Sequence, residues 1–273
     1  MSTIRREFVK LLFQKRTYIG WGGMFIIPFL IMLGFRFSSG PRGQGGQQDV
    51  GGFIFELVKS NGLFLIVATL SVMLIFFLPL FASMSGSYTI AGEAESGTLR
   101  TTLMQPVRRG TLLMSKWLVS NIYVAICLLS LGIASLIAGG AVFGLKAAPL
   151  FTGQTVSVGH ALGLLVASYA FVFVGLMCVV SLAVLFSTFT NSSLTAVAAA
   201  LGLVIVMLVL GNIPQFAFLQ PYLFPAKFNA WTNFLSSPVE WGPVIKAFIN
   251  FAVWIVGTTG LAYWRFSRKD ILS

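Results

Sequence analysis

The sequence predicts an all-α membrane protein with six transmembrane helices in one domain, and two observations carry the prediction. Charged residues make up only 9% of the 273 residues and hydrophobic residues 57%, whereas charged residues form about a quarter of a soluble domain. Long uncharged stretches also separate the charges, and a helix needs roughly 20 apolar residues to cross a bilayer. Continuous apolar runs such as LFLIVATLSVMLIFFLPLF lack the alternation that a membrane β-barrel requires.

Residues 1–17 predict a short amphipathic helix on the inner membrane surface. The apolar face would hold Ile4, Phe8, Leu11 and Leu12, and the polar face Arg6, Glu7 and Lys10. A basic helix of this kind binds at the lipid headgroups. The residues expected to make the interfacial contact are Arg5, Arg6, Phe8, Lys10 and Leu11. A cluster of charges that only orients the chain in the membrane is the alternative.

The six predicted spans cover residues 18–37, 62–87, 117–143, 161–186, 194–213 and 244–264. Four of them each fill one uncharged stretch. The other two share the stretch between Lys146 and Lys227, which the polar run STFTNSS divides. In the third span, Gly140 and Gly144 have a spacing that lets helices approach closely. The first apolar run is long enough to remain as an anchor, so we expect no cleaved signal peptide.

The basic residues predict the orientation of the chain. An even number of spans places both termini on one side, together with the loop after the second span. That side holds twelve of the 18 Lys and Arg residues, and the opposite side holds six. Because basic loops stay in the cytosol, we expect a multi-pass protein of the inner (cytoplasmic) membrane with cytoplasmic termini. The net charge of +11 then reflects this topology and contact with anionic lipids. It does not indicate nucleic acid, because no stretch is long enough for a basic folded domain.

Residues 214–243 predict short helices before the sixth span. Prolines interrupt regular helix in this segment, and Tyr222, Trp231 and Trp241 are of the residue types found in the headgroup belt. We expect short interfacial or re-entrant helices against the outer leaflet. They would either cap the outer end of a transport pathway or serve as an aromatic anchor, and the sequence favours neither.

The Cys and His residues predict no disulfide and no metal site. Cys127 and Cys178 fall inside predicted spans, where they are expected to be small apolar core residues. His160 is the single histidine and has no Cys, Asp or Glu near it in the sequence. An interfacial position is expected for it.

The polar segment of residues 92–117 does not have the pattern of a nucleotide site or of a catalytic site. GEAESGTL has the glycine spacing of a phosphate loop, but Thr98 stands where the lysine should be, and Glu93 and Glu95 would repel phosphate. These carboxylates are two residues apart, so a helix would point them about 200° apart. No His or Cys accompanies them. We expect no enzymatic activity and no cofactor on this chain.

The same segment has the pattern of a rigid docking element. Ser96 or Thr98 can cap a short helix that starts at Leu99. Leu103 falls on the same side as Leu99, and Pro106 ends the helix. Arg100 lies off the leucine side, and Arg108 and Arg109 follow the break. A cytosolic partner could bind such a rigid, charged element between two spans. The alternative is an ordinary charged loop.

EAESGTLRTTLMQPVRRGTLLMSKW resembles the segment after the second span in type-2 exporter permeases of the ATP-binding cassette (ABC) transporters. Members commonly have an acidic residue, then Gly-Thr-Leu, then Pro with Arg one or two places on, then Lys at the start of the third span. The matching residues are Glu93 or Glu95, Gly97, Thr98, Leu99, Pro106, Arg108 and Lys116. The tail YWRFSRKDIL resembles the family's usual ending at Phe266, Arg268, Lys269 and Asp270.

The resemblance implies a permease subunit that pairs with a second permease subunit, as a homodimer or a heterodimer. It also implies a pair of separate ABC ATPase subunits, which hold ATP and Mg. A cytoplasmic coupling helix between spans two and three would contact the ATPase, the initial helix would brace it, and residues 188–193 would make a second, minor contact. The residues implied in coupling are Glu93, Glu95, Ser96, Gly97, Thr98, Leu99, Arg100, Leu103, Pro106, Arg108 and Lys116.

Two other functions compete with export. A membrane scaffold or signalling protein could recruit a cytosolic partner through residues 92–117 without moving a solute. An intramembrane enzyme would want clustered His, Asp or Glu inside the spans, and the sequence places none there. Because the span interiors lack charge, an exported cargo would be hydrophobic or amphipathic, although carbonyl and hydroxyl groups could also serve an ion.

Overall fold

The computed structural model describes residues 3–13, 15–37, 56–98, 108–149, 155–236 and 238–268. The helices are Thr3–Leu12 (α1), Lys15–Phe37 (α2), Leu63–Ile75 (α4), Phe77–Ser87 (α5), Ala91–Glu95 (α6), Arg109–Phe143 (α8), Val158–Phe189 (α9), Ser193–Asn212 (α10) and Trp241–Arg268 (α11). Two 3-10 helices, Pro214–Leu219 (η1) and Pro225–Leu235 (η2), follow α10. A two-residue antiparallel pair, Ala148–Pro149 (β1) and Thr155–Val156 (β2), joins α8 to α9.

The described helices include five that are long and apolar enough to cross a membrane: Thr17–Phe37 within α2, and α8, α9, α10 and α11. Helices α4 and α5 pass the same test as a pair, with a bend of 53° between them. The total is six when this pair forms one broken span, as the sequence predicts. Helix α8 begins at residue 109, well before the predicted start of the third span at 117, so the helix continues beyond the apolar part.

The bend between α4 and α5 has a cause in the sequence. Pro79 has no backbone N–H, so it cannot donate a hydrogen bond to the carbonyl group of Ile75, the last residue of α4. Phe76, between the two helices, has φ −139° and ψ −50°, which is not helical. A proline in the middle of a span therefore divides it.

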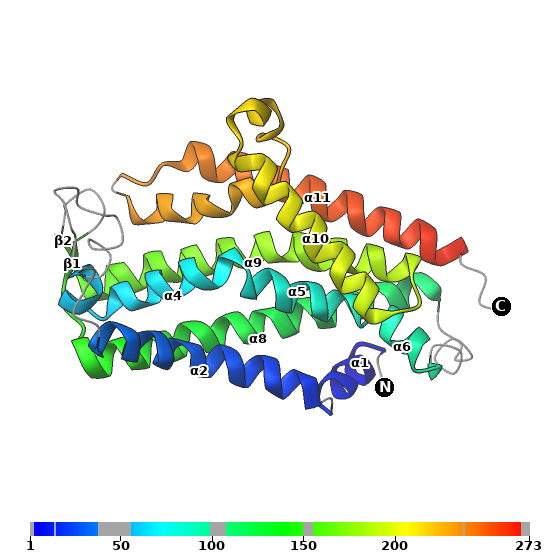
Figure 1. Ribbon diagram of the computed structural model, residues 1–273, viewed down its shortest axis with the longest axis horizontal. Helices are drawn as coiled ribbons and strands as arrows, with labels where there is room; N and C mark the ends of the chain where they lie inside the picture. Colours follow the sequence, from blue (N-terminus) through cyan, green and yellow to red (C-terminus); the bar gives the residue numbers. More distant parts are fainter. Residues whose placement is uncertain are drawn as a thin grey trace.

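Helix α9 is the centre of the bundle (Figure 1). Helices α5, α8, α10 and α11 pack against it, and α2 packs on the far side of α8. In Figure 1, α2 therefore lies along one edge of the bundle, opposite α11. Most of the apolar residues of α2 and α11 are exposed in the single chain, which fits a surface covered by lipid or by other membrane subunits.

The 3-10 helix η2 belongs to the core. It packs against α9, and Phe228, Trp231 and Phe234 are buried. Trp231 is only 2% exposed, so its predicted place in the headgroup belt was wrong: its ring fills the space beside α9. Tyr222 and Trp241 are exposed, as such a belt requires. The position of this segment at the outer leaflet stays a prediction.

Two glycines allow α8 to touch the start of α4. A Cβ atom at Gly139 would overlap the backbone carbonyl group of Gly62, and the reverse holds for a Cβ at Gly62. The Gly62 N–H donates to the carbonyl oxygen of Gly144 at 2.9 Å. The close approach therefore uses Gly139, whereas the spacing in the sequence pointed to Gly140 and Gly144.

We expect Gly139→Ala to lower the free energy of unfolding by about 1–3 kcal/mol relative to Gly140→Ala, because the new methyl group collides with backbone that cannot move aside. A Cβ at Gly140 would meet only the Leu145 side chain at 3.4 Å, so this adjacent substitution is a matched control. Thermal unfolding of both variants in one detergent measures the difference. Equal midpoints would show that the two backbones do not touch.

Candidate functional site

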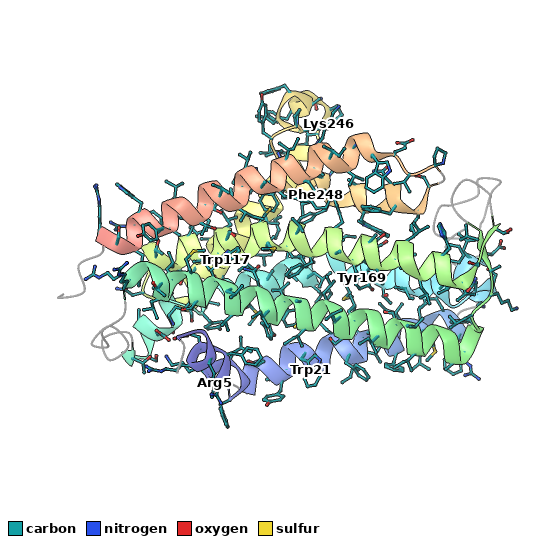
Figure 2. The ribbon with its side chains drawn as sticks, turned by 180° about the vertical axis from the view of Figure 1, so that it is seen from behind. Arg5, Trp21, Trp117, Tyr169, Lys246 and Phe248 are labelled. Atoms are coloured by element: carbon teal, nitrogen blue, oxygen red, sulfur yellow. The ribbon has the colours of Figure 1, made fainter. Side chains whose placement is uncertain are left out.

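The first and last described helices meet the described start of the segment after the second span at one end of the bundle. Helices α1 and α6, the start of α8 and the end of α11 lie there, and the β1–β2 pair lies at the opposite end (Figure 1). Figure 2 shows Arg5 on α1 at this end. The described basic residues gathered there are Arg5, Arg6, Lys10, Arg108, Arg109, Lys116, Arg265 and Arg268. We call it the basic end.

Four charged side chains form a closed ring at the basic end. Lys116 of α8 places its Nζ 2.6 Å from Glu93 Oε1 and 3.1 Å from Glu7 Oε2. Lys10 places its Nζ 3.1 Å from the same oxygen of Glu93 and 3.5 Å from Glu7 Oε1. This charge ring, Glu7, Lys10, Glu93 and Lys116, joins α1, α6 and α8.

The charge ring is largely shielded from water. The Lys116 side chain is 2% exposed, and those of Glu7 and Glu93 are 10% and 15% exposed. Removing an ammonium group from water costs several kcal/mol unless opposite charges surround it closely, and here two carboxylates do. The predicted polar face of the first helix is therefore divided: Arg6 is exposed, but Glu7 turns inward to Lys116.

Lys10 is the most accessible member of the ring, with a side chain that is 47% exposed. Burial on its own would lower the pKa of Lys10, but the carboxylates of Glu93 and Glu7 outweigh it and raise the pKa above its ordinary value. A raised pKa means that this attraction is present below the ordinary lysine pKa and is lost only as the pH rises through the folded value. Lys10 is therefore cationic at neutral pH.

Glu95 ties the same segment to a different helix. Its Oε2 accepts a hydrogen bond from the backbone N–H of Ser193 at 2.9 Å and another from the Ser193 hydroxyl. Ser193 is the first residue of α10, so the carboxylate lies at the positive end of that helix's dipole. The sequence left open whether Glu93 or Glu95 anchors the segment; both are anchored, to different partners.

Ser187 makes a third connection and is fully buried. Its Oγ accepts hydrogen bonds from the N–H groups of Ile90 and Ala91, at 3.2 and 2.8 Å, and donates to the Ser87 carbonyl at 2.8 Å. These bonds satisfy backbone groups at the start of α6. Sequence reasoning missed Ser187 because a serine near the end of an apolar helix carries no local signal for this contact.

Helix α6 ends in a tight polar turn. Gly97 has φ +71°, a conformation that L side chains rarely adopt. The hydroxyl groups of Ser96 and Thr98 lie 2.9 Å apart, and both donate to the carbonyl oxygen of Glu93. The turn therefore explains the Gly-Thr pair of the motif: Gly97 adopts the positive φ, and the Thr98 hydroxyl donates to the Glu93 carbonyl.

The middle of the predicted coupling segment, including Leu99, Arg100, Leu103 and Pro106, lies outside the described residues. The described chain resumes at Arg108, which is exposed and in extended conformation before α8. Further along α8, Trp117, labelled in Figure 2, donates from Nε1 to Ser181 Oγ at 2.8 Å and joins this helix to α9.

The end of α11 closes the basic end from the other side. Arg109 Nη1 donates to the Ser267 carbonyl at 3.2 Å, and a Cβ at Gly110 would overlap the Tyr263 ring. The Arg265 guanidinium lies 5.3 Å from the centre of the Phe189 ring. Within the described ranges, no group of three or more His, Cys, Asp or Glu residues could hold a metal ion.

Replacing Lys116 by Met should leave the Glu7 and Glu93 carboxylates facing each other without the buried ammonium group, and with only the half-exposed Lys10 between them. We expect the free energy of unfolding to fall by about 3 kcal/mol, measured by thermal or denaturant unfolding in detergent. Adding Glu7→Gln should recover part of the loss, because it removes one of the opposed charges. Lys246→Met, at an exposed lysine of α11, is the control and should change little. A Lys116→Met protein as stable as that control would contradict the ring.

Comparison with protein families fits this arrangement of helices. A family model described as "ABC-2 family transporter protein" matches residues 4–271, nearly the whole chain. No curated protein matches the chain. The membrane permeases of this family lack an ATPase domain. The chain therefore belongs to the ABC-2 family of transporter proteins, as a multi-pass membrane permease subunit.

Proposed function

We propose that this permease subunit exports its cargo in a complex with a second permease subunit and a pair of separate ATPase subunits, and that residues 92–117 couple it to ATP hydrolysis. One observation carries the proposal: helix α6, in which this segment begins, is fixed at once to α1, α8, α9 and α10. An element held in this way cannot move without moving four helices.

Each carboxylate of the motif would have its own task in this coupling. Glu93, in the charge ring, links the segment to the first helix and to the start of the third span. Glu95 links it to the short turn between α9 and α10, the place of the predicted second contact. A push from an ATPase on residues 92–117 would then reach both halves of the bundle together.

An apolar groove supports a hydrophobic or amphipathic cargo. It has a volume of about 380 Å³ and lies between α8 and α9, with Leu129, Ile133, Leu165 and Phe173 in its wall. The charge-free interior of the spans points the same way, because a path for ions usually carries ionisable groups. Transport would follow alternation of the spans around such a surface as the ATPases close and open.

The first test is recovery of the complex and its activity. We expect the chain purified alone to hydrolyse no ATP, and the chain purified from native membranes to retain a protein with the motifs of an ABC ATPase. Glu95→Gln should lower cargo-stimulated ATP hydrolysis about fivefold, which corresponds to losing roughly 1 kcal/mol from one partly exposed charged hydrogen bond.

Glu240→Gln is the matched control, since Glu240 is exposed and lies just before α11. It should leave both assembly and stimulated hydrolysis unchanged. If no ATPase accompanies the chain from native membranes, the coupling role fails. If an ATPase is retained but no cargo or nucleotide changes its rate, the chain recruits a partner as a scaffold.

The second test is the orientation of the basic end. Both cysteines of the chain, Cys127 and Cys178, are buried, so an introduced cysteine can be labelled against a low background. We expect a membrane-impermeant maleimide to label Ser96→Cys only in opened cells or inverted vesicles, and His160→Cys in intact cells. Labelling of Ser96→Cys from outside would place residues 92–117 on the wrong side for any cytosolic motor.

A further inference from the structure

Two adjoining cavities lie beside the charge ring. The first, of about 290 Å³, is polar: its wall includes Lys10, Glu93, Ser96 and Thr98. The second, of about 200 Å³, is mostly apolar and lies between α2 and α5. Leu11, Ser85 and Tyr88 line both, so the two cavities share a wall of three residues.

A carboxylate in the wall of the polar cavity has one buried oxygen that lacks a donor. Glu93 Oε1 forms ion pairs with both lysines of the ring, whereas Glu93 Oε2 is buried and accepts no hydrogen bond from the residues that the structure describes. A buried acceptor without a donor loses its hydrogen bonds to water and gains none within the protein. This costs about 1–3 kcal/mol of stability, and more when the acceptor is charged. A cationic N–H donor from a ligand would remove this penalty.

The same cavity offers a cation at its accessible side. Lys10 is half exposed and lines the wall together with the hydroxyl groups of Ser96 and Thr98. Because the two lysines and two glutamates of the ring balance, the site as a whole has no net charge to attract a simple anion. It is suited to a ligand with a positive and a negative group close together.

The apolar cavity lies where an acyl chain would. Thr17 and Gly20 belong to the first turns of the first span. Phe81 and Met84 belong to the last turns of α5. With α1 at the inner membrane surface, as the sequence predicts, this wall would be within the hydrocarbon layer next to the cytosolic headgroups. A ligand that filled both cavities would have a polar head and an apolar tail.

We propose that these two cavities bind a phosphatidylethanolamine-type lipid from the inner leaflet. The Glu93 carboxylate turns toward the polar cavity so that the ammonium group donates to Oε2, the phosphate contacts Lys10, and one acyl chain enters the cavity between α2 and α5. A choline lipid has no N–H to donate, and a glycerol lipid has no cation. The bound lipid would share the Glu93 carboxylate with the charge ring and loosen the hold of α6 on α1, so that membrane composition would regulate coupling.

The test measures lipid binding to the purified, delipidated chain, so it needs neither an ATPase nor transport and can fail independently of the proposed function. Lipids with identical acyl chains and ethanolamine, N-methylated ethanolamine, choline or glycerol headgroups are compared by native mass spectrometry and by thermal shift. We expect about tenfold tighter retention of the ethanolamine lipid than of the choline lipid, as for loss of one charged hydrogen bond. Affinity should fall sharply when the last N–H is methylated.

Two variants that make the same chemical change locate the site. Glu93→Gln should bring retention of ethanolamine and choline lipids to the same level, whereas Glu95→Gln, which lies outside both cavities, should keep the preference. Equal retention of all headgroups by the unaltered chain would overturn the proposal and leave the polar cavity to water. Equal stabilisation by soluble glycerophosphoethanolamine would overturn the role of the acyl chain. The methylation series decides the question even if Glu93→Gln does not fold.

Discussion

The basic end depends on one constraint: the ammonium group of Lys116 is almost completely withdrawn from water. A buried charge persists only where opposite charges meet it at short range. No acidic residue of α8 itself can do so, because its sequence from Arg109 to Phe143 contains none. Glu7 and Glu93 must come from two other elements, and their arrival fixes α1 and α6 against α8.

This constraint separates the rigid part of the molecule from the part free to move. At the basic end, charged and hydroxyl side chains hold α6 to several helices. Within the bilayer, contacts are mainly apolar packing, and α2 and α11 are covered on one side only. Apolar surfaces slide past one another more readily than a satisfied charge ring opens. In the proposed mechanism, a force on the segment after the second span would therefore move α1, α8 and α10 together.

Features that depend on local composition could be predicted from the sequence. Features that depend on contacts between distant residues could not. The spacing of charges predicted an all-helical chain with long apolar helices, because the cost of charge in lipid acts on each segment separately. It could not locate Gly139, the inward turn of Glu7 or the burial of Trp231, since each depends on a partner distant in the chain. The motif singled out Glu93 and Glu95, but only the fold gave them different partners.

Glu93 joins the two functions proposed for this end of the molecule, because its two oxygens have different surroundings. Oε1 closes the charge ring, and Oε2 is buried in the wall of the polar cavity without a donor. A donor at Oε2 would draw negative charge away from Oε1 and relax its hold on Lys10 and Lys116, whereas an empty cavity would leave the ring at full strength. Coupling through residues 92–117 and binding at the lipid site would therefore depend on each other. The lipid headgroup beside α1 would act on the Glu93 carboxylate and so determine how firmly the segment after the second span is held.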